Sequence, residues 1–221
     1  MSSPAQLSRL PLRQQIYVIL RERIVNGELA PGTSVRDAQV AEALGASRTP
    51  VREALVRLTS EGMLLNLVGR GFRVPPLLRS EVEEAHPLLI TLEPLALQTS
   101  PACSPARAKR LEALSRRMEK AAGKPALLNE LDGQWHRCLI EACPNSRLHK
   151  YIEELRDTLR RYELAHLMHD ESIHSSIDEH RAIATAEGQH DRTLALNLLT
   201  SHWQRGRAEL LARITDTDES C

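Results

Sequence analysis

The chain has 221 residues, of which 42% are apolar and 26% charged, so it is long enough for two modest domains with separate cores. No apolar run approaches the roughly 20 residues of a membrane-spanning helix, there is no signal peptide, and the four cysteines form no Cys-x-x-Cys pair. These features exclude membrane-spanning proteins, disulfide scaffolds and thiolate metal sites. We therefore expect a cytoplasmic protein with free thiols.

The formal net charge of zero conceals an uneven distribution. Residues 1–76 hold ten arginines against six acidic residues, whereas the rest of the chain holds nineteen basic residues against twenty-three acidic ones. The N-terminal part is therefore suited to a polyanion. Its basic residues are all arginine, which favours planar, bidentate contacts.

Residues 12–76 predict a helix-turn-helix with a wing. A helical apolar period ends at Gly27, a second short helix spans about 37–44, and Gly45 turns the chain into a third helix. The segments 63–68 and 72–74 flank Gly69-Arg70-Gly71, which predicts a two-stranded hairpin with a basic tip. Pro75-Pro76 closes this domain, because consecutive prolines disfavour both helix and sheet.

The third helix has the features of a DNA-recognition helix. Ser47 or Thr49 can cap its N-terminus, and Pro50 fits the first turn, where no N–H is needed. A buried stripe with helical spacing is formed by Val51, Leu55 and Leu58. The outward face then carries Arg48, Thr49 and Arg52, which are suited to phosphate contacts and to bidentate reading of guanine.

Residues 77–214 predict six helices with short connections, the pattern of an antiparallel bundle. The first has a capping box of Ser80 and Glu83, and we expect Pro87 and Pro94 to kink or divide it. The others span about 105–122, 125–143, 145–167, a segment ending at 188 after a His/Asp/Ser-rich loop, and 190–214. We expect flexible ends over 1–11 and 215–221.

One carboxylate and three histidines fall at inward positions of the predicted bundle. Asp132 and His136 lie one helical turn apart at the edge of an apolar stripe, close enough to share a cation. His180 and His202 occupy the apolar faces of the last two helices. Neutral imidazoles and an ionised Asp can hold a divalent metal and leave positions open for water or a small anion.

The simpler alternative is that each of these histidines is an ordinary core residue bonded to a carbonyl group. Trp135 and Trp203, which neighbour the candidate ligands, are expected to pack in the core. The remaining histidines are interpreted as surface or loop residues and receive no role; they are His86, His149, His166, His169, His174 and His190.

The chain resembles the GntR transcription regulators that carry an FCD effector domain. The motifs of the N-terminal half are Pro31-Gly32, Leu44 through Leu55, Glu61-Gly62 and Gly69-Arg70-Gly71. Those of the C-terminal half are Leu92 through Ala96, Asp132 through His136, Pro144-Asn145, His180 through Ile183, and His202. Six effector-domain helices resemble the shorter, VanR-type branch. The resemblance implies that Asp132, His136, His180 and His202 bind a divalent metal.

Two positions depart from the family pattern. Ala38 stands where the family commonly has a DNA-backbone arginine, with Arg36 two residues earlier on a different face. Leu89 stands at the place of an arginine thought to hold acidic ligands. The effector is therefore expected to be less acidic, or held mainly by the metal.

The leading hypothesis is a homodimeric regulator, more specifically a repressor, that binds a palindromic operator and senses a small organic acid at a zinc, nickel or manganese ion. Arg48, Thr49 and Arg52 would read the DNA, with Arg70 in the adjacent minor groove or on the backbone. The first alternative is a metal-dependent hydrolase fused to a DNA-binding module, for which Glu179 is the one nearby base. The second is a regulator whose helical domain only dimerises.

Overall fold

The computed structural model describes residues 10–166 and 170–214, and side chains over 10–164 and 173–214. Residues 1–9 of the expected flexible N-terminus (1–11) and the tail 215–221 lie outside these residues, as do the side chains of His166 and His169. Contacts divide the chain into two compact units, with the division between Pro76 and Leu77. No helix in the described residues is both long and apolar enough to cross a membrane.

The first unit contains three helices and a small antiparallel sheet. The helices are α1 (Leu12–Val25), α2 (Asp37–Ala43) and α3 (Arg48–Ser60), and the strands are β1 (Ser34–Val35), β2 (Leu65–Leu67) and β3 (Gly71–Arg73). The sheet order is β1-β3-β2, so the predicted hairpin gains a third strand. A two-residue strand has no alternating pattern that could have been recognised in the sequence.

Helix α3 buries the stripe that its sequence predicts. Val51, Leu55 and Leu58 are each 0% exposed and form the core of the unit with residues of α1 and β3. Ser47 occupies the N-cap position, but its side chain makes no capping hydrogen bond. Thr49 lies inside the helix, so the expectation that it caps the helix is wrong.

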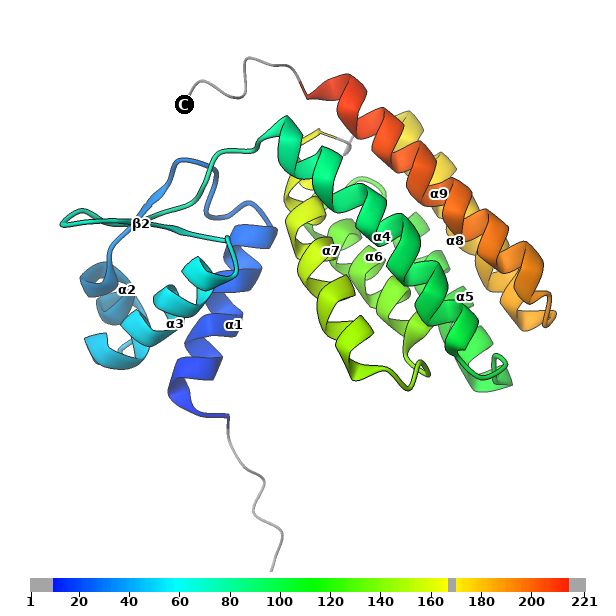
Figure 1. Ribbon diagram of the computed structural model, residues 1–221, viewed down its shortest axis with the longest axis horizontal. Helices are drawn as coiled ribbons and strands as arrows, with labels where there is room; N and C mark the ends of the chain where they lie inside the picture. The colour runs from blue at the N-terminus through cyan, green and yellow to red at the C-terminus, as the bar shows by residue number, and fades with distance from the viewer. Residues whose placement is uncertain (1–9, 167–169, 215–221) are drawn as a thin grey trace, which may run out of the picture. The chain divides into compact units, whose positions relative to one another are not determined.

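The second unit is a closed ring of six helices. They are α4 (Arg79–Thr99), α5 (Pro105–Lys120), α6 (Pro125–Ile140), α7 (Ser146–His166), α8 (Asp170–Gly188) and α9 (Arg192–Arg213). Neighbouring pairs follow the order α4-α7-α6-α5-α8-α9, and α9 then packs against α4 again. The first and last helices are thus adjacent (Figure 1), and Arg79 Nη1 at the start of α4 donates to the carbonyl oxygen of Leu211 at 2.7 Å.

Helix α4 is continuous, so of the two expected effects of its prolines, a kink or a division, the division does not occur. Pro87 and Pro94 are seven residues apart, two helical turns, and neither is buried: Pro87 is exposed and Pro94 partly exposed. The predicted capping box is also absent, because α4 begins at Arg79 and Leu78 is its N-cap. At the start of α5, by contrast, the side chain of Ser104 accepts from the Arg107 N–H.

The sequence predicted a His/Asp/Ser-rich loop between the helix that runs to about residue 167 and the helix that ends at residue 188. Most of that segment is helical, because α8 already begins at Asp170. His174 therefore lies on a helix rather than in a loop, while residues 167–169 lie outside the description. Helix α9 begins at Arg192, two residues later than expected. The Asp191 side chain caps it by accepting from the Leu194 N–H at 2.9 Å, and His190 has a positive φ of 62° just before it.

Candidate functional site

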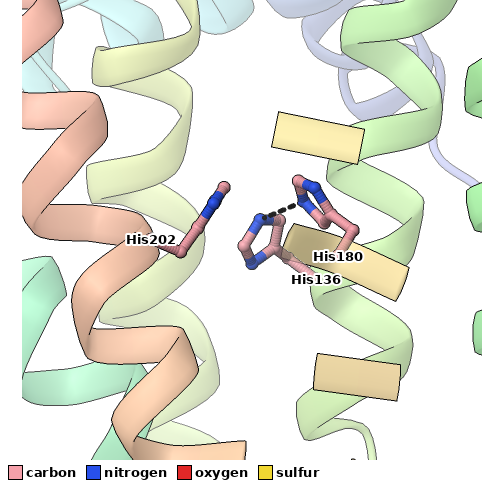
Figure 2. Close-up of side chains that lie close together, drawn as sticks. All are labelled: His136, His180 and His202. Carbon is pink, nitrogen blue, oxygen red and sulfur yellow. Dashed lines mark hydrogen bonds between the residues drawn. The ribbon is translucent and has the colours of Figure 1, made fainter. Parts of the chain in front are cut away.

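Three histidines from three helices meet inside the ring. His136 on α6, His180 on α8 and His202 on α9 present possible ligand atoms that all lie within 4.8 Å of one another. Figure 2 shows the three rings facing a common space, with the Nε2 atoms of His136 and His180 at 3.1 Å. Asp132 Oδ1 lies 3.1 Å from His180 Nε2 and 3.8 Å from His136 Nε2. The structure therefore brings together all four residues that the sequence singled out.

Each ring has a hydrogen-bond acceptor behind it. Glu93 Oε1 lies 3.0 Å from Nδ1 of His136, the Ser176 carbonyl oxygen lies 2.6 Å from Nδ1 of His180, and Glu179 Oε2 lies 2.7 Å from Nδ1 of His202. These acceptors place the proton on Nδ1, so the Nε2 lone pairs of His136 and His180 face each other. Such lone pairs repel, and a cation bound to both nitrogens would remove the repulsion.

The distances and protonation states suit a divalent metal. Two nitrogens about 2.1 Å from one metal and at right angles lie about 3 Å apart, close to the separation of the two Nε2 atoms. Burial and the nearby Arg156 lower the pKa of His136 to about 3, and burial lowers that of His202. Although burial opposes it, His136, His180 and Arg156 hold the pKa of Asp132 well below its usual value. Neutral imidazoles and an ionised carboxylate are the forms that ligate metals.

Two further charged residues, Glu93 and Arg156, contact the candidate metal ligands. Neither of them was identified as a site residue from the sequence. Glu93 is 0% exposed and accepts from His136 Nδ1 and, at 2.5 Å, from Trp203 Nε1. Arg156 is 2% exposed and donates to Asp132 Oδ2 at 2.8 Å. Its position four residues after Ile152 and three before Leu159 puts it on an apolar stripe, which is a detectable signal of a buried arginine.

The carboxylate of Glu179 is hydrogen-bonded to two side chains and is therefore not available as a general base. His202 and both nitrogens of the Arg205 fork bond its carboxylate, and these bonds lower its pKa to about 2 against the opposing effect of burial. A carboxylate with so low a pKa is a weak proton acceptor at neutral pH. The hydrolase alternative thus loses its one named base.

His86 is buried, so its assignment to the surface is wrong. It is 1% exposed on α4, and neither ring nitrogen has a hydrogen-bond partner among the described residues. Val82 and Leu89 lie on the same helical face, which is the sequence signal for this burial. Desolvation is the main cause that lowers its pKa to about 4. Trp135 and Trp203 are both buried, as expected of core residues.

A cavity of about 80 Å³ lies beside the histidines. Asp132, His136 and His202 line one part of it, and the apolar wall includes Met118, Leu128 and Ile177. A small molecule in this cavity could reach the candidate metal ligands directly. Leu89, at the place of the family's arginine, is fully buried in the core and does not line the cavity.

The candidate DNA-contacting residues lie on the exposed face of the first unit. Arg48 and Arg52 on α3 are 68% and 65% exposed, and both approach the carboxylate of Asp37, at 2.9 and 3.6 Å. The hydrogen bond from Arg48 lowers the pKa of Asp37. Thr49 is exposed beside them. Asp37 therefore holds the two arginine forks near each other at the start of α3.

The wing contributes a second basic element. Arg70 is exposed in the turn between β2 and β3, and its N–H donates to the Leu67 carbonyl oxygen. Arg36, also exposed, packs its backbone and side chain against Gly71 at the base of the wing. Ala38 is exposed on α2 and offers no polar side chain to DNA.

Comparison with known proteins agrees with both units. Residues 12–74 match the family model of bacterial regulatory proteins, gntR family, and residues 84–205 match the FCD domain. The uncharacterized HTH-type transcriptional regulator YdhC of Bacillus subtilis is 25% identical, with 87% of this chain and 88% of that protein covered. A probable D-xylose utilization operon transcriptional repressor of Paenarthrobacter nicotinovorans is 28% identical, with 89% and 88% covered.

Among solved structures, E. coli McbR/YncC has the same fold, with a TM-score of 0.81, 23% identity, and 91% of this chain and 98% of that chain covered. The FCD match alone spans more than half of the chain, and the helical ring follows the helix-turn-helix in the order that the two models require. The relatives are transcription regulators rather than enzymes. The chain therefore belongs to the GntR family of bacterial transcription regulators, with an N-terminal winged helix-turn-helix and a C-terminal FCD domain.

Proposed function

We propose that this regulator is a repressor whose FCD domain holds a divalent metal on Asp132, His136, His180 and His202 and senses a small organic acid there. The observation that carries the proposal is the convergence of the Nε2 atoms of His136 and His180 at 3.1 Å, with a hydrogen-bond acceptor at Nδ1 of each ring. Nitrogen and carboxylate ligands suit zinc, nickel or manganese. The repressor name of a relative that covers most of the chain supports the sign of regulation.

The metal would supply a Lewis-acidic position at which a carboxylate oxygen of the effector binds. The protein's own contribution is orientation: Glu93, the Ser176 carbonyl group and Glu179 fix the rings, while Arg156 fixes Asp132. The adjoining cavity would hold the rest of the effector away from water.

Control of DNA binding would follow from a dimer with two arrangements. Residues 12–76 of two copies would place their α3 helices in successive major grooves of a palindromic operator, with Arg48, Thr49, Arg52, Arg70 and Arg36 on the DNA. Residues 77–214 would dimerise and bind the effector. An effector that binds one arrangement more tightly shifts the population toward it and so changes operator affinity.

The test begins with metal analysis of the purified protein and a titration of its own promoter DNA, with and without chelator. We expect about one divalent ion per chain, a thermal shift with organic acids that chelator abolishes, and loss of both in His180→Ala. His174→Ala, which removes an exposed histidine from the same helix, is the matched control. The proposal would be contradicted if the purified protein contained no metal and its thermal shift with organic acids were the same with and without chelator. Catalytic turnover of the organic acid would instead favour the hydrolase alternative.

A further inference from the structure

The cavity beside the histidines contains polar groups that the proposed metal does not use. Two of these groups are Asn129 on α6 and Glu163 on α7, which line the cavity together with the apolar residues described above. Because the inference concerns the effector of this same cavity, it rests on the proposed function. These two side chains can determine which chemical groups of an organic acid the cavity binds.

Asn129 offers an unused hydrogen-bond donor. It is 1% exposed, its Oδ1 accepts from Arg160 Nε at 3.2 Å, and its Nδ2 has no partner among the described residues. Asn129 precedes Asp132 by three residues and His136 by seven, so the three share one face of α6. A carboxylate oxygen bound at the histidines would therefore lie near a donor that needs an acceptor.

Glu163 offers an acceptor and opposes a second anion. Its side chain forms no ion pair within 4 Å with the other described side chains, while Arg156 and Arg160 are already bonded to Asp132 and Asn129. The other acidic residue at the cavity, Glu209, is paired with Arg205.

We infer that the effector is a monocarboxylate that also carries a hydroxyl or amine group, and that Asn129 and Glu163 select it against dicarboxylates. The carboxylate accepts from Asn129 Nδ2 beside the histidines, and the hydroxyl or amine donates to Glu163. A second carboxylate would instead meet the carboxyl groups of Glu163 and Glu209. The apolar wall of Met118, Leu128 and Ile177 limits the connecting chain to a short hydrocarbon.

Calorimetric titration of the metal-loaded protein with four-carbon acids tests this selection. The probes are butanoate, the three hydroxybutanoates, 4-aminobutanoate and succinate. We expect at least one hydroxy or amino acid to bind at least tenfold more tightly than succinate. Succinate binding more tightly than all of them would overturn the inference but leave organic-acid sensing intact, whereas binding of none would overturn both.

Substitutions of Glu163 and Asn129 test whether these two residues cause the preference for monocarboxylates over succinate. Glu163→Gln should bring succinate within about threefold of the best monocarboxylate, and Glu130→Gln, which removes an exposed charge from α6, should leave the ratio unchanged. Asn129→Asp keeps an oxygen for Arg160 but replaces the donor, so we expect at least tenfold weaker binding of every acid with an unchanged melting temperature without ligand. An unchanged ratio in folded Glu163→Gln, or unchanged affinities in Asn129→Asp, would contradict the assignment.

Discussion

At the scale of single residues, the three histidines are held by three different acceptors. A buried carboxylate of α4 holds His136, a main-chain carbonyl group of α8 holds His180, and the half-buried Glu179 holds His202. Since each acceptor favours one tautomer and one ring orientation, little rearrangement would be needed for the proposed metal to bind.

Glu179→Ala should weaken metal binding about 10- to 100-fold, because His202 loses the acceptor that orients its ring. Titration with a metal-competing chelator measures the change. Glu209→Ala is the matched control, since Glu209 also bonds Arg205 but does not contact His202. If the two substitutions weakened metal binding equally, the loss would come from the changed pairing of Arg205 and not from the lost hydrogen bond to His202.

His86 makes the fold sensitive to acid. Its pKa is about 4 in the folded state, below the ordinary histidine value of 6.5, so the unfolded chain binds the proton first as pH falls, and stability is lost between about pH 6.5 and 4. His86→Leu should remove this loss, which amounts to about 3 kcal/mol once both states are protonated. Urea unfolding at pH 7 and pH 4 checks it. An identical pH dependence in wild type and variant would contradict the assignment.

At the scale of elements, the sequence predicted the helices better than it predicted the site. Asp132 and His136 could be paired because a helix places i and i+4 together, and His180 and His202 could be placed on apolar faces. Glu93 could not be assigned to His136, because they are 43 residues apart and meet only through the packing of α4 on α6. The continuity of α4 through two prolines likewise depends on which side of the helix faces the core.

The wing depends on a glycine at its base. Gly71 has φ of +86°, and an added Cβ would lie 3.1 Å from the Val35 carbonyl oxygen of β1, whereas Gly69, with φ of +71°, has open space around it. Gly71→Ala should therefore destabilise the first unit more than Gly69→Ala, which carries only the conformational cost of about 1 to 2 kcal/mol. Thermal unfolding of the two variants makes the comparison. If the two variants lost the same stability, β1 would have to shift enough to accommodate the added methyl group at residue 71.

At the scale of the whole molecule, the candidate DNA-contacting arginines and the cavity beside the histidines belong to separate compact units. The family and the two-unit organisation follow from motifs that local sequence carries, such as the Gly-rich turns and the Asp-x-x-x-His pair. The choice of effector does not, because the cavity wall comes from five helices far apart in the chain. The proposed effector specificity would thus depend on the closed ring of helices rather than on any one motif.

Arg52→Ala should weaken binding to the protein's own promoter DNA by about 1 to 3 kcal/mol if Arg52 makes a bidentate base contact. Arg23→Ala, which removes an exposed charge from α1, controls for the general loss of positive charge. Fluorescence anisotropy at two salt concentrations separates base contact from charge. Unchanged affinity in Arg52→Ala would remove α3 as the reading element.

The hydrogen bond from Arg79 to the Leu211 carbonyl oxygen joins the two ends of the helical ring, and a longer contact of 3.4 Å reaches the carbonyl oxygen of Ile214. Arg79 is three residues beyond Pro76, where the first unit ends, and α9 carries His202. A displacement of the end of α9 must therefore either move the first turn of α4 or break these bonds. Arg79 therefore ties the end of α9 to the first turn of α4, three residues after the Pro75-Pro76 connector.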